Sequence, residues 1–228
     1  MMKLKNKIFN HEKIDIGYDD LDTTTTDSGR NYLTPDGHQY PSVTTVLSIL
    51  NEDIIRAWRE RVGEEEANRV SGRAAGRGTR VHSIVEKYLN NEDTTEFLPN
   101  IRQSLENLKP ALEDIDTIYG LEVALYSHHL GLAGRCDCIG KYKGVPSIID
   151  FKTSRYIKKK EKISNYFAQG AAYSIMWEER TGMVVPNIVI IMDVDHDKPS
   201  VFVEHRDNWT DLLHNTIDEY RKRKMFGH

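Results

Sequence analysis

The sequence predicts an α/β (α+β) fold in which helices flank one central mixed β-sheet. Three segments in the middle of the chain, 121–127, 131–142 and 145–154, are rich in apolar and β-branched residues and predict consecutive antiparallel strands. Helical periodicity precedes them. A helix, two further strands and a last helix follow them. This order predicts helices packed against the faces of one sheet.

The amino-acid composition restricts the classes of protein to which this chain can belong. With 228 residues, 39% of them apolar and 29% charged, the chain can form one large domain, and we expect an N-terminal hairpin and extension at 1–45 and a core with a helical insertion at 46–228. No apolar run approaches the roughly 20 residues that span a bilayer, so we expect no membrane partner and a cytoplasmic location. Cys136 and Cys138 are the two cysteines, too few for an iron–sulfur cluster.

The N-terminal part predicts a loop, a hairpin and a helix. The polar stretch 23–30 is typical of a loop. The Pro-Asp-Gly sequence at 35–37 predicts the turn of a short hairpin. Ser42 precedes an apolar segment and is well placed to cap a helix between Val43 and Arg61.

Two helical regions follow. Glu64 to Asn90 shows helical periodicity, and the glycines at 76 and 78 predict a break that divides it into two helices. The second of these presents an apolar stripe formed by Val81, Ile84, Val85, Tyr88 and Leu89. A further helix is predicted over Asn100–Glu113, although Pro110 falls late in it.

The last third predicts a helix, two strands and a helix. Tyr166–Arg180 is helical in pattern, and Gly182 is placed to end it. Pro186–Asp193 is a continuous apolar run, typical of a strand buried on both faces. Residues 199–205 predict another strand, and Trp209–Lys224 the terminal helix.

The hairpin turns predict that three acidic residues meet. If Lys143 and Gly144 form a two-residue loop, Asp137 lies opposite Asp150. If 129–130 is the preceding loop, Glu122 lies opposite Asp137. A β-bulge in either hairpin would shift this pairing.

Lys152 shares the face of this carboxylate row, because side chains alternate along a strand. Opposed carboxylates repel unless something neutralises them, and a hard divalent cation such as Mg²⁺ or Mn²⁺ is the natural partner of such a set. The alternative is that the acids form the solvent-facing half of an amphipathic sheet, with Lys152 as an ion-pair partner.

These residues form a recognisable pattern. GRCD ending at Asp137, followed after twelve residues by DFK, with Glu122 upstream, resembles the active-site motif of the PD-(D/E)XK nuclease superfamily. GTRVH at 78–82 and QGAAY at 169–173 are similar to motifs of its RecB-like exonuclease branch. Within that branch the chain most resembles the mitochondrial genome maintenance exonucleases and their phage-encoded relatives.

The resemblance implies roles for individual residues. Glu122, Asp137 and Asp150 would bind the catalytic Mg²⁺ or Mn²⁺, with the carbonyl of Phe151 as a further ligand, and Lys152 would act on the attacking water. His82 would be an additional catalytic metal ligand, although a histidine beside an apolar stripe can also be structural. Gln169 and Tyr173 would contact substrate or order the site, although Tyr173 also fits a core position.

A nuclease must also attract DNA despite its acidic site, and the net charge of −4 argues against binding through bulk charge. Local basic runs could contact phosphates: an arginine series on the helical region before the sheet, a lysine loop after the third strand, and Arg221 to Lys224, which we interpret as a solvated face. The predicted substrate-binding residues in these runs are Arg73, Arg77, Arg80 and Lys158.

The sequence therefore predicts a metal-dependent DNA exonuclease that acts on single-stranded ends or flaps in replication, recombination or repair. It would work in the host cytoplasm if it is phage-encoded. Two alternatives remain open: a structure-selective endonuclease or resolvase on the same fold, and a catalytically inactive DNA-binding recombination module. No feature of the sequence identifies a protein partner.

Overall fold

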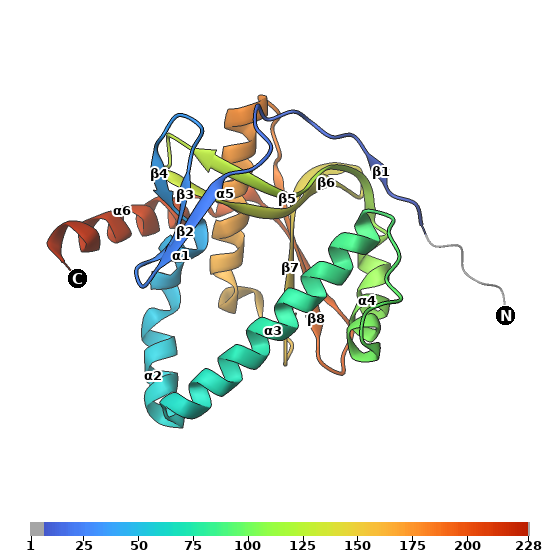
Figure 1. The fold of residues 1–228 in the computed structure, drawn as a ribbon, viewed down its shortest axis with the longest axis horizontal. Coiled ribbons are helices and arrows are strands. Elements are labelled where there is room, and N and C mark those ends of the chain that lie inside the picture. Colours follow the sequence, from blue (N-terminus) through green and yellow to red (C-terminus); the bar gives the residue numbers. More distant parts are fainter. Residues whose placement is uncertain (1–6, 228) are drawn as a thin grey trace.

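A mixed six-stranded sheet forms the centre of the molecule (Figure 1). The computed structural model describes residues 7–227. The strand order is β1-β5-β6-β7-β8-β9. The β1–β5 and β7–β8 pairs are parallel and the other neighbours antiparallel, which confirms the predicted mixed sheet. The strands are β1 (Asn10–His11), β5 (Ile115–Ser127), β6 (Leu132–Tyr142), β7 (Val145–Ser154), β8 (Asn187–Val194) and β9 (Ser200–His205).

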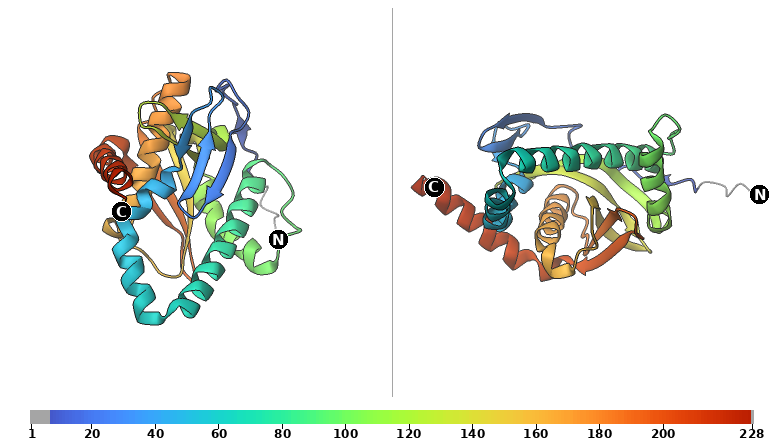
Figure 2. Two further views of the ribbon diagram at one scale, coloured as in Figure 1. Left: turned by 60° about the vertical axis from the view of Figure 1, so that its left-hand side comes forward. Right: turned by 90° about the horizontal axis from the view of Figure 1, so that it is seen from below.

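Helices cover both faces of this sheet (Figure 2). Helices α3 (Glu64–Leu89) and α4 (Pro99–Leu112) pack on one face, and α5 (Ser164–Thr181) packs on the other. The helices α1 (Val43–Leu47) and α6 (Thr210–Phe226) pack against α5. Short 3₁₀ helices lie at Ser48–Asn51, Lys160–Lys162 and Arg206–Asn208.

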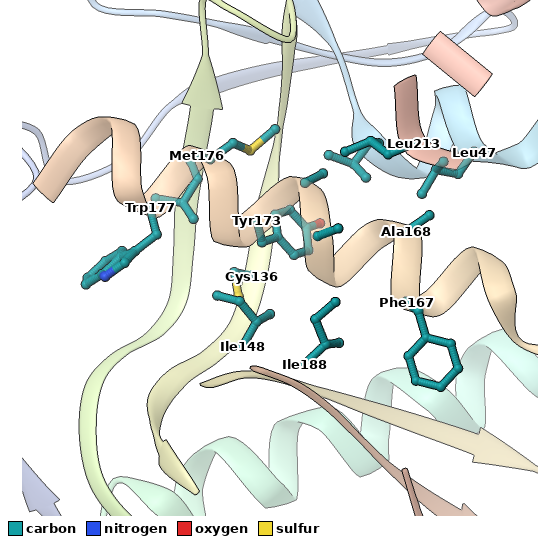
Figure 3. Packing of buried hydrophobic residues seen from close by; sticks show 14 of the residues in the cluster. Leu47, Cys136, Ile148, Phe167, Ala168, Tyr173, Met176, Trp177, Ile188 and Leu213 are labelled. Carbon is teal, nitrogen blue, oxygen red and sulfur yellow. The ribbon is translucent and has the colours of Figure 1, made fainter. Parts of the chain in front are cut away.

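The sequence of strand β8 is continuously apolar because both faces of the strand are buried. Ile188, Ile190 and Met192 belong to the core cluster beneath α5, whereas Val189 and Ile191 belong to the cluster beneath α3 and α4. The alternation of side chains across the strand therefore fills two separate cores. Figure 3 shows the α5 cluster from close by.

Helix termini follow the predicted signals. The Ser42 hydroxyl accepts a hydrogen bond from the Thr45 backbone N–H and caps α1. The segment after α1 is not one helix, however, because a 3₁₀ turn separates α1 from α2 (Glu52–Val62). Gly182 adopts the left-handed conformation, with φ of 70°, and ends α5.

The polar stretch predicted as a loop is instead a strand. β2 (Asp22–Thr26) pairs with β3 (Gly29–Leu33), which pairs with β4 (Gln39–Pro41) to form a separate three-stranded sheet. The predicted hairpin is therefore the β3–β4 half of this sheet. The loop prediction was wrong because threonine, although polar, is β-branched and favours an extended backbone.

The predicted break at Gly76–Gly78 was also wrong, because α3 is one continuous helix. Each helical glycine costs up to about 1 kcal/mol, and here tertiary contacts outweigh that cost. Arg77 forms ion pairs with Asp193 and Asp195, at 2.5 and 2.7 Å, and so ties the middle of α3 to the end of β8. The α2 helix and the first half of α3 form an arm that projects from the sheet (Figures 1 and 2).

Among residues 7–227, no helix has both the length and the apolar character needed to cross a membrane.

Candidate active site

The hairpin register places the three acids as predicted. The pairs Tyr142↔Val145 and Cys138↔Ile149 put Asp137 in register with Asp150. The loop from β5 to β6 spans 128–131 and is longer than predicted, yet the register is unchanged because Ser127 pairs with Leu132.

Glu122 lies opposite Asp137 in this register. It falls between the pairs Leu121↔Cys138 and Val123↔Cys136. Its own φ of 50° is in the left-handed region, where a residue other than glycine is strained by about 1–2 kcal/mol. Arg135 donates hydrogen bonds to the Glu122 carbonyl oxygen, at 2.5 Å, and to Asp20, at 2.6 Å. Arg135 therefore holds the strained backbone in place, a role that the sequence did not indicate.

The β6–β7 ladder ends at Cys138↔Ile149, one residue before Asp137 and Asp150. Beyond that point the Phe151 N–H donates to Asp137 Oδ2 at 2.8 Å, in place of a ladder bond to β6. The N–H and C=O of one strand residue point to the same side, so the Phe151 carbonyl also faces Asp137. This orientation fits the metal-ligand role predicted for that carbonyl.

Helix α3 brings His82 over the sheet to the same place. Its Nδ1 lies 3.6 Å from Asp137 Oδ2. One ligand atom from each of His82, Glu122 and Asp137 lies within 4.8 Å of the others, a spacing suited to a shared metal ion. All three side chains are partly exposed, so substrate can reach the cluster.

The buried Asp150 and the partly buried Lys152 form an ion pair beside this cluster. Lys152 Nζ donates to Asp150 Oδ1 at 2.6 Å and lies 2.5 Å from Oδ2. Burial raises the pKa of Asp150, and the Asp137 charge adds to this effect, while Lys152 opposes it. Burial would lower the pKa of Lys152, but Asp150 and Asp137 outweigh it and raise that pKa, so the ammonium stays charged. Asp150 Oδ2 is buried and accepts no well-directed hydrogen bond, and its charge is balanced by the Lys152 ammonium.

The pKa of Glu122 is strongly raised. Burial first, and then the charges of Asp137 and Glu86, raise its pKa from 4.5 to about 7. Glu86 lies one helical turn after His82 on α3. A cavity of about 270 Å³ opens here and is lined by Glu86 and Glu122 together with His11 and Lys13 from the N-terminal segment. The charges of neighbouring carboxylates therefore disfavour the ionised form of Glu122.

Gln169 and Tyr173 are buried residues of α5. They are 8% and 2% exposed, and Gln169 Nε2 lies 3.4 Å from the Tyr173 hydroxyl. Tyr173 packs in the core under α5 (Figure 3), and its ring leaves no room for a side chain at Gly134 on β6. In this structure the pair supports the strand that carries Asp137, and Tyr173 has no surface to offer a substrate.

The predicted basic residues divide into two groups. Arg77 is held by Asp193 and Asp195, so its charge braces the fold, and Arg69 pairs with Glu66. Arg73 lines a cavity of about 410 Å³ at the end of β7, together with Arg155. Neither of these two forms an ion pair within residues 7–227.

The other two predicted substrate-binding residues are Arg80 and Lys158. Arg80 is an exposed residue of α3. Lys158 lies over the Tyr166 ring, 5.4 Å from its centroid, and Lys152 lies 5.1 Å from the same centroid. Tyr166 thus links the lysine loop to the candidate catalytic lysine.

Comparison with known proteins relates the chain to exonucleases. It is 29% identical over 125 residues to human (Homo sapiens) mitochondrial genome maintenance exonuclease 1, a match that covers 50% of this chain and 36% of that protein. The mouse (Mus musculus) protein is 26% identical over 137 residues, covering 56% of this chain and 40% of that protein. The chain therefore spans well under half the length of these relatives.

No protein-family model matches the chain. A solved structure of a candidate exonuclease from Eubacterium rectale has a TM-score of 0.44 and 15% identity, with 68% of this chain and 70% of that chain covered. The relationship therefore rests on the sequence matches. They confirm the resemblance to PD-(D/E)XK-like nucleases and support a nuclease function, so the chain is a low-identity relative of the mitochondrial genome maintenance exonucleases.

Proposed function

We propose that this protein is a metal-dependent DNA exonuclease of the PD-(D/E)XK type that hydrolyses phosphodiester bonds from single-stranded ends or flaps. The observation that carries the proposal is the cluster of His82, Glu122 and Asp137 beside the Asp150–Lys152 pair. The name of the sequence relatives supports a role in DNA replication, recombination or repair.

The donor set fits a divalent cation. Glu122, Asp137 and Asp150 would supply carboxylate oxygens, with the Phe151 carbonyl and His82 completing the protein ligands. Oxygen donors suit Mg²⁺ and Mn²⁺, and the imidazole of His82 favours Mn²⁺ of the two. When bound, the cation would polarise the phosphate and make water a better nucleophile.

Lys152 would act directly on the reacting atoms. Its ammonium is charged and held by Asp150, so it can orient the attacking water and stabilise the negative charge that develops on the phosphate. Because the Lys152 side chain is 19% exposed, the charge lies at the edge of the site rather than fully within the core.

A single strand would bind at the end of β7. Arg73 and Arg155 in the cavity there can contact phosphates, with Thr153 and Ser154 beside them. Tyr156, in the loop that follows, is 75% exposed and can stack on an unpaired base. Contacts of this kind hold single strands without reading their sequence, in keeping with a general exonuclease.

The activity test uses end-labelled single-stranded, duplex and closed circular DNA with Mg²⁺ or Mn²⁺. We expect hydrolysis of linear single strands, abolished in Asp150→Asn and Lys152→Ala and retained in Lys222→Ala, which removes an exposed lysine of α6. Hydrolysis that persists in Lys152→Ala would contradict the mechanism. Degradation of closed circles would identify an endonuclease, and DNA binding without any hydrolysis would identify an inactive module.

The binding surface is tested separately by titrating a fluorescent single-stranded oligonucleotide in Ca²⁺ buffer. Arg73→Ala should weaken binding and reduce its salt dependence by about one phosphate contact. Arg77→Ala should chiefly lower the free energy of unfolding, because it leaves Asp193 buried without its partner. Equal effects of both variants on binding would contradict this division of the arginines.

A further inference from the structure

A second cluster of metal-ligating side chains lies in a different part of the fold. Asp36 and His38 come from the turn between β3 and β4, and His128 comes from the loop between β5 and β6. One ligand atom from each lies within 4.8 Å of the others, as in the candidate active site. These residues take no part in the proposed nuclease chemistry.

The distances in this cluster match the geometry of zinc. Asp36 Oδ2 lies 3.2 Å from His38 Nδ1 and 3.2 Å from His128 Nε2. Metal–ligand bonds of about 2.0–2.1 Å place two tetrahedral ligands about 3.3–3.4 Å apart. Two imidazoles and a carboxylate with a fourth position open to water form a common zinc ligand set, whereas Mg²⁺ prefers oxygen ligands alone.

The outer hydrogen bonds are those that a metal site requires. The Thr34 hydroxyl, on a buried residue, donates to Asp36 Oδ1 at 2.5 Å and leaves Oδ2 free for a ligand role. The Tyr40 hydroxyl oxygen lies 2.8 Å from His128 Nδ1 and can accept a hydrogen bond from the Nδ1–H group. In this tautomer Nε2 carries no proton and can bind the ion. Partners of this kind orient ligating side chains and fix the histidine tautomer.

The backbone around the cluster is also held in place. In the turn, the His38 N–H donates to Thr34 Oγ1 at 2.9 Å, and the Gly37 N–H donates to the Thr34 carbonyl at 2.9 Å. In the other loop, the His128 N–H donates to Glu179 Oε1 of α5 at 3.0 Å. The ligands are therefore preorganised from two elements far apart in the sequence.

We propose that Asp36, His38 and His128 form a binding site for Zn²⁺ or a similar transition-metal ion that clamps the three-stranded sheet to the β5–β6 hairpin. The same hairpin strands carry Glu122 and Asp137, so the clamp anchors the N-terminal sheet to the strands of the candidate active site. The clamp is distinct in ligand chemistry from that site and does not depend on the proposed nuclease function.

The test measures Zn²⁺ binding to the tag-free chain of residues 1–228 in the His82→Ala, Asp137→Asn background, which disables the candidate active site. Isothermal titration should show one Zn²⁺ per chain, and Co²⁺ should give the visible absorption bands of tetrahedral coordination. Tyr40→Phe should weaken Zn²⁺ binding by about 10–100-fold. His128→Ala and the conservative Asp36→Asn should weaken it at least as much.

The matched control is His129→Ala, which removes the neighbouring histidine of the same loop and should leave Zn²⁺ affinity unchanged. Circular dichroism of each variant without metal verifies folding. The proposal is overturned if the background variant takes up no Zn²⁺, or if Zn²⁺ binds His38→Ala and His128→Ala as tightly as the background.

Discussion

Replacement of Glu122 by glutamine should stabilise the metal-free protein at neutral and alkaline pH. In the unfolded chain this carboxyl ionises near pH 4.5, and in the folded protein near pH 7, because burial and the charges of Asp137 and Glu86 disfavour its ionised form. Between these values the folded state holds one more proton. The free energy of unfolding therefore falls as pH rises from about 4.5 to 7. Glutamine removes this pH-dependent loss.

The magnitude follows from the pKa difference. A rise from 4.5 to about 7 is 2.5 units, and at about 1.4 kcal/mol per unit the full effect is about 3.5 kcal/mol above pH 7. Glu122 is only partly buried, so solvent screening reduces the effect to roughly half. We expect the stability of Glu122→Gln relative to wild type to increase by about 1–2 kcal/mol between pH 5 and pH 8.

Urea unfolding in EDTA at pH 5, 6, 7 and 8 measures this difference, with Glu60→Gln as a control at an exposed position of α2. Saturating Mn²⁺ should then stabilise wild type more than Glu122→Gln, because the ion neutralises the charge that the variant lacks. A difference between wild type and variant that stays constant from pH 5 to 8, or that favours wild type at pH 8, would refute the electrostatic account of this site.

Two further predictions concern packing around the site. Lys152→Met should abolish hydrolysis. It should also lower the free energy of unfolding by about 3–5 kcal/mol at pH 8, since it leaves Asp150 buried without a cation. A loss of less than about 1 kcal/mol, measured by urea unfolding, would contradict this prediction. Gly170→Ala should lower the free energy of unfolding by about 1–3 kcal/mol, because the new Cβ would lie 2.4 Å from Ile188 Cγ2. Gly72→Ala, in open space on α3, should raise it by up to about 1 kcal/mol. Thermal unfolding that ranks the two variants the other way would contradict the packing of α5 on β8.

The register of the candidate site was predictable because it depends on short-range information. The Lys143–Gly144 turn determines which residues of β6 and β7 face each other, and one correct turn places Asp137 beside Asp150. The β5–β6 loop was predicted too short, but lengthening a hairpin loop by one residue on each side preserves the pairing of the strands. The row of acids was therefore insensitive to that error.

The contributions of α3 were less predictable because they depend on tertiary contacts. Glycines at 76 and 78 weaken a helix locally, whereas the ion pairs of Arg77 with residues more than one hundred positions away hold the middle of the helix in place. Glu86 gains its influence on Glu122 from the way this continuous helix crosses the sheet. Likewise, the role of Arg135 follows from a backbone strain at Glu122 that no local pattern indicates.

Contacts in the fold determine which basic residues of the sequence are already paired with acidic residues. Counted along the chain, the arginines of α3 form a uniform positive series, but the fold neutralises Arg69 with Glu66 and commits Arg77 to the end of β8. Arg73 and Arg155 remain at the cavity that follows β7. Two basic residues without an ion pair among residues 7–227 therefore lie at one end of β7. A net charge of −4 is compatible with DNA binding because the fold distributes the charges in this way.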